Sequence, residues 1–184
     1  MKHIKLFENF EEWTFEKVKN MIDDIKSICF DLTDDVQYQV NMITPLNDIQ
    51  VKTLYLYLKR PNEYPSLKSH SAIGLNITRN SKKSPIDLIQ TVLHLKRYME
   101  LNGFKCDIIN HSVGYPSIFL EFKENMVDGE EVYNIYSKSE SKKGDFNDII
   151  ITSNQIKDDS YWRKNTTSSI LISSLNIEFT LMSH

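Results

Sequence analysis

The stretch Ser84–His111 reads SPIDLIQTVLHLKRYMELNGFKCDIINH and predicts one helix, a sharp stop and one strand. Ser84 is suited to cap the helix, because its hydroxyl can accept a hydrogen bond from a free amide of the first turn. Pro85 is tolerated at the first helical position, where no amide is needed. The apolar residues that follow recur at helical spacing and are Leu88, Ile89, Val92, Leu93, Leu95 and Met99.

Asn102-Gly103 predicts the end of this helix, since glycine readily adopts the left-handed conformation found just beyond a helix. Phe104, Cys106 and Ile108 then alternate with polar residues, which is the periodicity of a strand. The wide apolar stripe of the helix indicates that it lies across a sheet.

The remaining periodic segments predict an α+β fold with two amphipathic helices packed on a mainly antiparallel sheet. Phe15–Cys29 forms the second helix, which Thr14 can cap. Asp128-Gly129 is a hairpin turn signal. The expected strands are 36–42, 51–59, 73–77, 104–108, 118–122, 132–136 and 175–181. Residues 31–35 are expected to form a turn, 149–151 a buried strand or one turn of helix, and 153–169 a polar region without an assigned element.

Composition indicates an ordinary globular protein. The chain has 184 residues, of which 40% are hydrophobic and 26% charged, and this length favours a single domain. We expect an amphipathic leader over 1–13 and one domain over 14–184. Cys29 and Cys106 occupy apolar periodic positions, so both are expected to be buried free thiols.

The leader, residues 1–10, reads MKHIKLFENF, with Ile4, Phe7 and Phe10 spaced three apart. It resembles the M-K-x-I-K-x-F-E-x-F opening of small proteins of tailed phages, particularly phages of Bacteroidetes-type hosts. The resemblance covers ten residues and implies a phage or phage-derived origin, without an activity or site residues. The leader is either a docking peptide for another protein or a first turn that packs on its own domain.

The sequence contains no catalytic, metal-binding or cofactor-binding motif. None of the five histidines has a metal-ligand spacing to a cysteine, an acidic residue or a second histidine. Adjacent carboxylates such as Asp34-Asp35 and Asp158-Asp159 are typical of turns. We therefore expect no metal and no cofactor. An enzyme built from residues scattered along the chain remains an alternative, with unknown catalytic residues.

Two segments are candidates for binding an anion or single-stranded nucleic acid. Lys82, Lys83 and Ser84 precede the central helix, whose N-terminal amides favour negative charge. The alternative for them is a solvated loop. The second segment places aromatic and cationic side chains together, as base-stacking sites do, and consists of Tyr161, Trp162, Arg163 and Lys164. Here the alternative is a tryptophan that covers the core.

The net charge of −3 argues against general attraction to nucleic acid. No apolar run is long enough to span a bilayer, and Lys5 and Glu8 interrupt any signal-peptide stretch. The favoured hypothesis is a non-enzymatic phage accessory protein, in the host cytoplasm or associated with the virion, that binds a protein of the virion or the host without contacting a membrane. Weak binding of single-stranded nucleic acid is the alternative.

Overall fold

The computed structural model describes residues 13–34, 37–45, 47–60, 63, 72–81, 83–110, 117–138 and 146–182, with the backbone alone for 34, 138 and 146–150. The leader residues Ile4, Phe7 and Phe10 lie outside the described residues, as does Lys82. Seven helices and seven strands fall within the described part. The helices are α1 (Phe15–Ile28), α2 (Phe30–Asp34), α3 (Asp48–Lys59), α4 (Ile86–Leu101), α5 (Ser153–Lys157), α6 (Asp159–Lys164) and α7 (Thr166–Leu171). The strands are β1 (Tyr38–Thr44), β2 (Ile73–Arg79), β3 (Phe104–Asn110), β4 (Ile118–Val127), β5 (Glu130–Lys138), β6 (Phe146–Ile151) and β7 (Ser174–Leu181).

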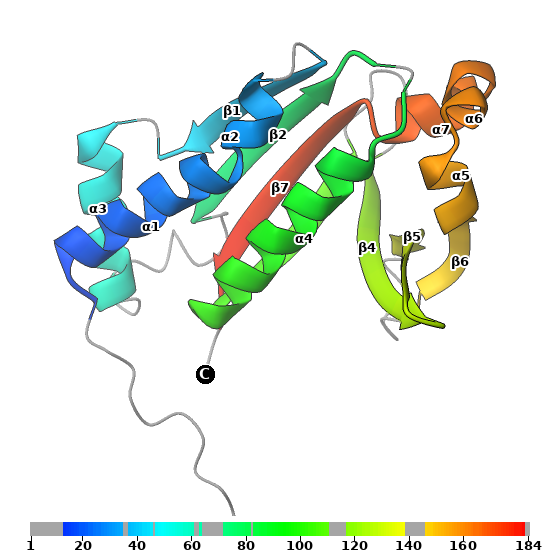
Figure 1. The fold of residues 1–184 in the computed structure, drawn as a ribbon. Helices are drawn as coiled ribbons and strands as arrows, with labels where there is room; N and C mark the ends of the chain where they lie inside the picture. Colours follow the sequence, from blue (N-terminus) through cyan, green and yellow to red (C-terminus); the bar gives the residue numbers. More distant parts are fainter. Residues whose placement is uncertain are drawn as a thin grey trace, which may run out of the picture.

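The strands form one sheet in the order β1-β2-β7-β3-β4-β5-β6. Every neighbouring pair is antiparallel. The C-terminal strand β7 therefore lies between β2 and β3, in the middle of the sheet (Figure 1). The predicted α+β class and the antiparallel sheet are confirmed. The expected number of two helices is too low.

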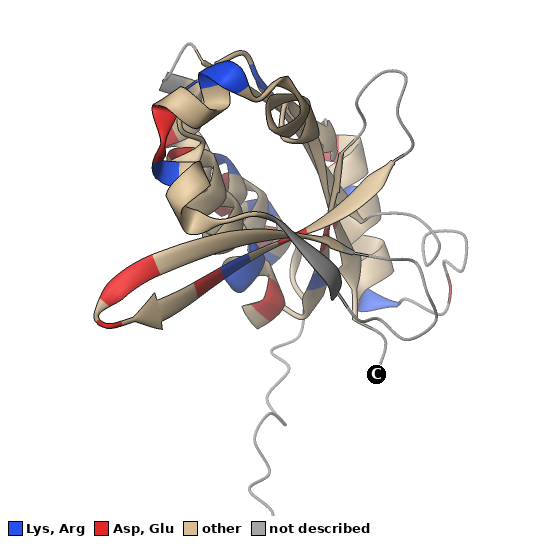
Figure 2. Ribbon diagram, turned by 90° about the vertical axis from the view of Figure 1, so that its right-hand side faces the viewer, with Lys and Arg blue, Asp and Glu red and all other residues tan. Residues whose placement is uncertain are grey.

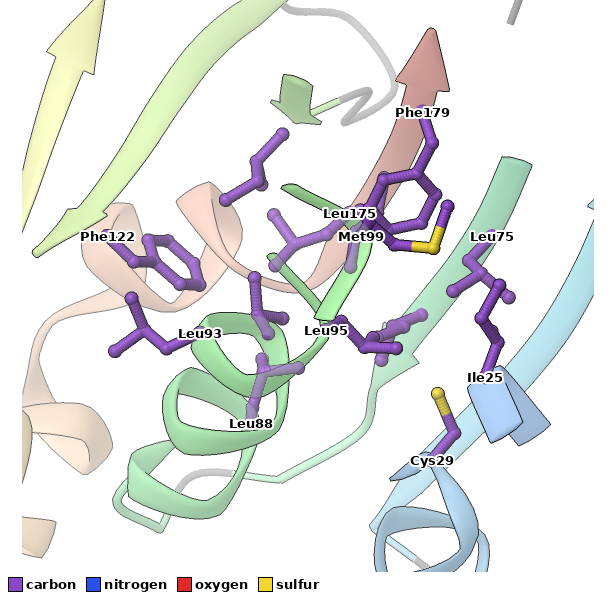
Figure 3. Packing of buried hydrophobic residues seen from close by; sticks show 14 of the residues in the cluster. Ile25, Cys29, Leu75, Leu88, Leu93, Leu95, Met99, Phe122, Leu175 and Phe179 are labelled. Carbon is purple, nitrogen blue, oxygen red and sulfur yellow. The ribbon is translucent and has the colours of Figure 1, made fainter. Parts of the chain in front are cut away.

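Helices α1 and α4 lie over the same face of the sheet (Figure 1). Helix α1 buries one side of its surface, including Ile25, and α4 buries Leu88, Leu95 and Met99 completely. Figure 3 shows Met99 directed toward Phe179 of β7. The core thus forms between these helices and the middle strands.

The central helix, its stop and the strand after it are confirmed. Gly103 has a φ of 84°, the left-handed conformation that the sequence predicts, and β3 starts at the next residue. The predicted cap position is wrong by one, because Pro85 is the N-cap, but the predicted bond from a first-turn amide to the Ser84 hydroxyl is present. The Ser84 hydroxyl accepts a 3.3 Å hydrogen bond from the Ile86 amide and donates one to the Ile156 carbonyl.

The prediction of a strand over 51–59 is wrong, because this segment belongs to α3. Asn47 caps the helix by accepting a hydrogen bond from the Gln50 amide. The buried residues are Val51, Leu54, Tyr57 and Leu58. Their spacing of three and four positions forms one face of a helix, and this face packs beside α1. The leucines of the segment also alternate with other residues, and this alternation led to the prediction of a strand.

Three further segments differ from the prediction or extend it. Residues 31–35 were expected as a turn, but Phe30–Asp34 forms α2. Residues 149–151 lie in β6, and most of the polar region 153–169 forms α5, α6 and α7. The hairpin at Asp128-Gly129 is confirmed, with positive φ angles of 52° and 82° that suit the tight turn between two antiparallel strands. In the described part of the chain, no helix has the length and apolar character needed to cross a membrane.

We predict that Leu93→Ala lowers the free energy of unfolding by about 2–4 kcal/mol, because truncation of a packed leucine removes apolar contacts and leaves a cavity. Leu93 is 7% exposed and lies near Phe122 of β4 in Figure 3. Denaturant unfolding measures the change. Leu101→Ala is the matched control, since Leu101 is 86% exposed on the same helix and its truncation should change stability by less than about 0.5 kcal/mol. Equal effects of the two substitutions would contradict the packing.

Candidate functional site

The structure brings the two candidate binding segments together at the N-terminal end of α4. The Ser84 amide donates a 2.7 Å hydrogen bond to Oδ1 of Asp159, the first residue of α6. The Ser84 hydroxyl donates to the carbonyl oxygen of Ile156 in α5, also at 2.7 Å. Because a carboxylate already occupies the Ser84 amide, an incoming phosphate would meet negative charge there.

Arg79, at the end of β2, is the buried cation of this junction. Its side chain is 4% exposed, and its guanidinium lies 5.1 Å from the centre of the Trp162 ring. Its Nη2 donates to the Lys83 carbonyl. Burial lowers the pKa of Arg79, while Tyr38 and the charge of Asp159 partly offset that effect. A buried guanidinium needs such partners, because an unpaired charge in the interior is strongly destabilising.

Arg79 therefore joins the segments of the junction rather than offering an open cationic site. Its Nε is buried without a hydrogen-bond partner among the described residues. The aromatic stacking and the bond to the Lys83 carbonyl hold the loop before α4 against α6. Nothing in the sequence distinguished Arg79 from an exposed strand-end arginine, so the sequence analysis missed it.

The four residues of the second candidate segment are divided between core and surface. Trp162 is 1% exposed, and its indole Nε1 donates a 3.0 Å hydrogen bond to the Ile156 carbonyl. Its ring therefore covers the core and does not face solvent. Tyr161 is half-buried and stacks edge-on against Trp162, with ring centres 5.4 Å apart. Arg163 and Lys164 are exposed, as is Lys83 in the loop before α4.

A second charged region lies where β3 and β4 separate beneath α4. The two strands pair only over Ile108–Asn110 and Ile118–Leu120, so a pocket of about 190 Å³ opens below that pairing. Lys96 of α4 lies 3.8 Å from Glu121 of β4. The other ion pairs around the opening are Lys96–Glu100 at 4.0 Å, Lys123–Glu121 at 3.5 Å and Lys105–Asp107 at 2.8 Å. These six side chains balance in charge, and Lys96 connects α4 to β4 through Glu121.

Cys106 also lines this opening, but its thiol is poorly suited to nucleophilic chemistry. Burial raises the pKa of Cys106 to about 12, and burial likewise raises the pKa of Cys29 to about 11. Because the thiolate is the nucleophile, both groups are protonated and inert near neutral pH. Both cysteines are free, as expected, but only Cys29 is buried, whereas Cys106 is partly exposed.

A pocket of about 270 Å³ lies between the end of α1, the start of β1 and the first half of α4. It is lined by Ile28, Asp31, Leu32, Tyr38, Asp87, Gln90, Thr91 and His94. His94 is exposed on α4. Among the described residues, no group of histidine, cysteine and acidic side chains has the arrangement of a metal site.

Exposed apolar side chains gather at the opposite end of α4, where the described chain begins. Leu101 is 86% exposed and Met182 is 40% exposed. The Met182 amide donates to the Gly103 carbonyl, so the backbone at Met182 lies beside the turn that follows Leu101. Trp13 packs edge-on against Phe104, with ring centres 6.1 Å apart. We call Trp13, Leu101 and Met182 the apolar end of the fold.

A groove adjoins the apolar end between α1 and α4. It has a volume of about 580 Å³ and is lined by Thr14, Glu16, Lys17, Asn20, Met21, Asp24, Tyr98 and Asn102. The Tyr98 hydroxyl donates a 2.6 Å hydrogen bond to Asp24 across it, so the two helices are linked through the groove. Helical spacing places Leu101 outside the buried stripe of α4, on the same side as the exposed His94, so its exposure agrees with the periodicity. The groove beside it could not be predicted, because α1 and α4 meet only through the fold.

Comparison with known proteins returned no match to a family model, to a curated protein or to a solved structure.

We predict that single-stranded DNA binds more weakly than about 1 µM at physiological salt, since phosphate binding needs a concentrated positive surface. Figure 2 shows basic and acidic residues interspersed along the ribbon. Fluorescence anisotropy with a labelled oligonucleotide measures the affinity. A submicromolar dissociation constant that is lost in the Arg163→Ala, Lys164→Ala double variant would instead make nucleic-acid binding the leading function.

Proposed function

We propose that this chain is a non-enzymatic protein-binding domain and that its partner contacts the apolar end together with the leader. The observation that carries the proposal is the exposure of Leu101 and Met182 beside the start of the described chain. Large apolar side chains exposed together are typical of protein-interaction sites. Trp13 anchors the chain on Phe104, and Phe10 precedes Trp13 by three residues. The leader is thus attached at the end of the fold that carries the exposed apolar residues.

The partner surface that fits this end has an apolar recess bordered by polar groups. Leu101 and Met182 supply apolar contact, while the neighbouring groove presents the side chains of Glu16, Lys17 and Asn20. An apolar centre with a polar rim is the usual composition of a protein interface. We further propose a protein of the virion or of the host cell as the partner, since the leader resembles those of phage proteins.

We predict that deleting residues 2–10 abolishes partner capture while the melting temperature changes by less than about 2 °C. The reason is that α1 is already capped by Thr14 and anchored by Trp13, so the fold does not need the leader to start. Affinity capture from infected cells, or detection in purified particles, measures the first quantity. Thermal unfolding measures the second.

Leu101→Asp tests the apolar end itself and should reduce capture at least about tenfold, as loss of a central apolar contact does. Ile49→Asp is the matched control, since Ile49 is 77% exposed at the start of α3, away from this end. Unchanged capture by both the deletion and Leu101→Asp would contradict the proposed function. A fall of several degrees in melting temperature on deletion would show that the leader belongs to the fold.

A further inference from the structure

The edge strand β1 carries no charged residue. It reads YQVNMIT from Tyr38 to Thr44, and it pairs with β2 on one side only. Alternate residues of an edge strand direct their N–H and C=O groups away from the sheet, and proteins usually protect such an edge with charged side chains. Although the whole chain is 26% charged, β1 has no charged side chain over seven residues. A β-bulge between Met42 and Thr44 interrupts its register with β2, so the regular edge is Tyr38–Met42. An exposed edge of this kind is suited to pairing with another strand.

A row of asparagines crosses the sheet and ends on β1. Asn41 lies opposite Asn76 of β2, and Asn76 lies opposite Asn176 of β7. The Asn76 amide donates a 2.8 Å hydrogen bond to Asn176 Oδ1, and the Thr78 hydroxyl donates to Asn76 Oδ1. Stacked asparagines on neighbouring strands stabilise one another through such amide bonds. Asn41 is the exposed outer member of this row.

One face of β1 is apolar and partly buried, and the other is mostly polar and exposed. Val40 and Met42 are partly buried against the hydrophobic core, whereas Gln39, Asn41 and Ile43 are exposed on the opposite face. Ile43 is 43% exposed, a large apolar group left at the edge of an otherwise polar row. A strand added beside β1 would have to match both faces.

We propose that β1 pairs antiparallel with β1 of a second copy of this chain, about a twofold axis at Asn41. Asn41 then faces Asn41 of the other copy, and the amide row runs on through six asparagines. Val40 faces Met42 on the core side, and Gln39 faces Ile43 on the polar side. The strand is free of charge, and the apolar residues Val40 and Met42 lie symmetrically about Asn41, so the core sides of the two copies match.

Two physical considerations favour a second copy over an unrelated strand. Symmetric pairing gives each residue two equivalent contacts from one sequence, which is why twofold dimers are the commonest oligomers. Each chain carries a net charge of −3, so two copies repel at most surfaces, and a charge-free strand is where contact costs least. The dimer is independent of the proposed partner site, because β1 is the edge strand and β2 separates it from β7, which ends just before Met182.

Disulfide trapping tests the register directly. Asn41→Cys should give a covalent dimer under mild oxidation, because opposing residues of an antiparallel pair lie within disulfide range. Gln39→Cys is the matched control on the same exposed face. In the proposed register its two copies are roughly 13 Å apart, too far for a disulfide. The wild-type chain, treated identically, controls for Cys29 and Cys106. Trapping of both variants alike, or of neither, would overturn the proposal.

Sedimentation velocity of the full chain provides the second measurement. The wild-type protein should sediment as a dimer at about 100 µM, the concentration range expected for a small interface. Asn41→Lys should raise the dimer dissociation constant at least about tenfold, because it places two like charges on the twofold axis. Ile49→Lys, which adds the same charge at an exposed site of α3, should leave the constant unchanged. A wild-type monomer at 100 µM, or equal dissociation constants for both lysine variants, would overturn the proposal.

Discussion

The fold depends on the insertion of the C-terminal strand β7 between β2 and β3. Strands β1 and β2 come from residues 38–79, while β3 to β6 come from residues 104–151, and β7 is the strand that pairs with both groups. Leu175, Ile177 and Phe179 have no exposed surface. The register places Ile177 beside Leu75 of β2 on one side and Ile108 of β3 on the other. This one residue therefore contributes to both the β2–β7 and the β7–β3 pairing. Since α4 lies over this seam, the core is complete only when the last strand is in place.

The approach to β7 is held by polar bonds that the apolar pattern does not suggest. Asn110 is 1% exposed, and its side-chain amide donates to the carbonyls of Ile170, Leu171 and Ser174. These bonds join the end of β3 to the turn between α7 and β7. Because buried carbonyls without partners are costly, the asparagine fixes the path of the chain into the sheet. The short helices α5, α6 and α7 precede β7, and α6 places Trp162 against Arg79. The Trp162 ring covers the core at that end of the sheet.

The sequence predicted the elements whose pattern is unambiguous. The stripe of α4, the stop at Gly103 and the alternation of β7 all agree with the structure. The strand prediction for 51–59 failed because the leucines and tyrosines satisfy a period of two as well as a helical period, and the helical face is the one that packs against α1. The three helices after β6 were missed because their polar sequences have little apolar periodicity, although Thr152, Asp158 and Asn165 cap them.

The residues of the candidate sites likewise divide into those that the sequence predicts and those that only the structure reveals. Exposure of Arg163 and Lys164 could be expected from their chemistry, whereas the burial of Arg79 and Trp162 depends on contacts between segments about 80 positions apart. The asparagine row is also invisible in the sequence, because Asn41, Asn76 and Asn176 meet only through the strand register. The apolar end and the edge of β1 are formed by residues that come together only in the folded chain. These two surfaces could therefore be identified only from the structure.

Hydrogen exchange in the Phe179→Ala variant tests most directly whether β7 unites the two groups of strands. Phe179 lies opposite Ile73 of β2 and Cys106 of β3, so its truncation weakens both sides of the seam. If the sheet folds as one unit, protection of the amides in β2 and β3 should fall by the same free energy, about 3–5 kcal/mol for loss of a buried phenylalanine. Loss of protection in one group while the other keeps its wild-type protection would contradict the account.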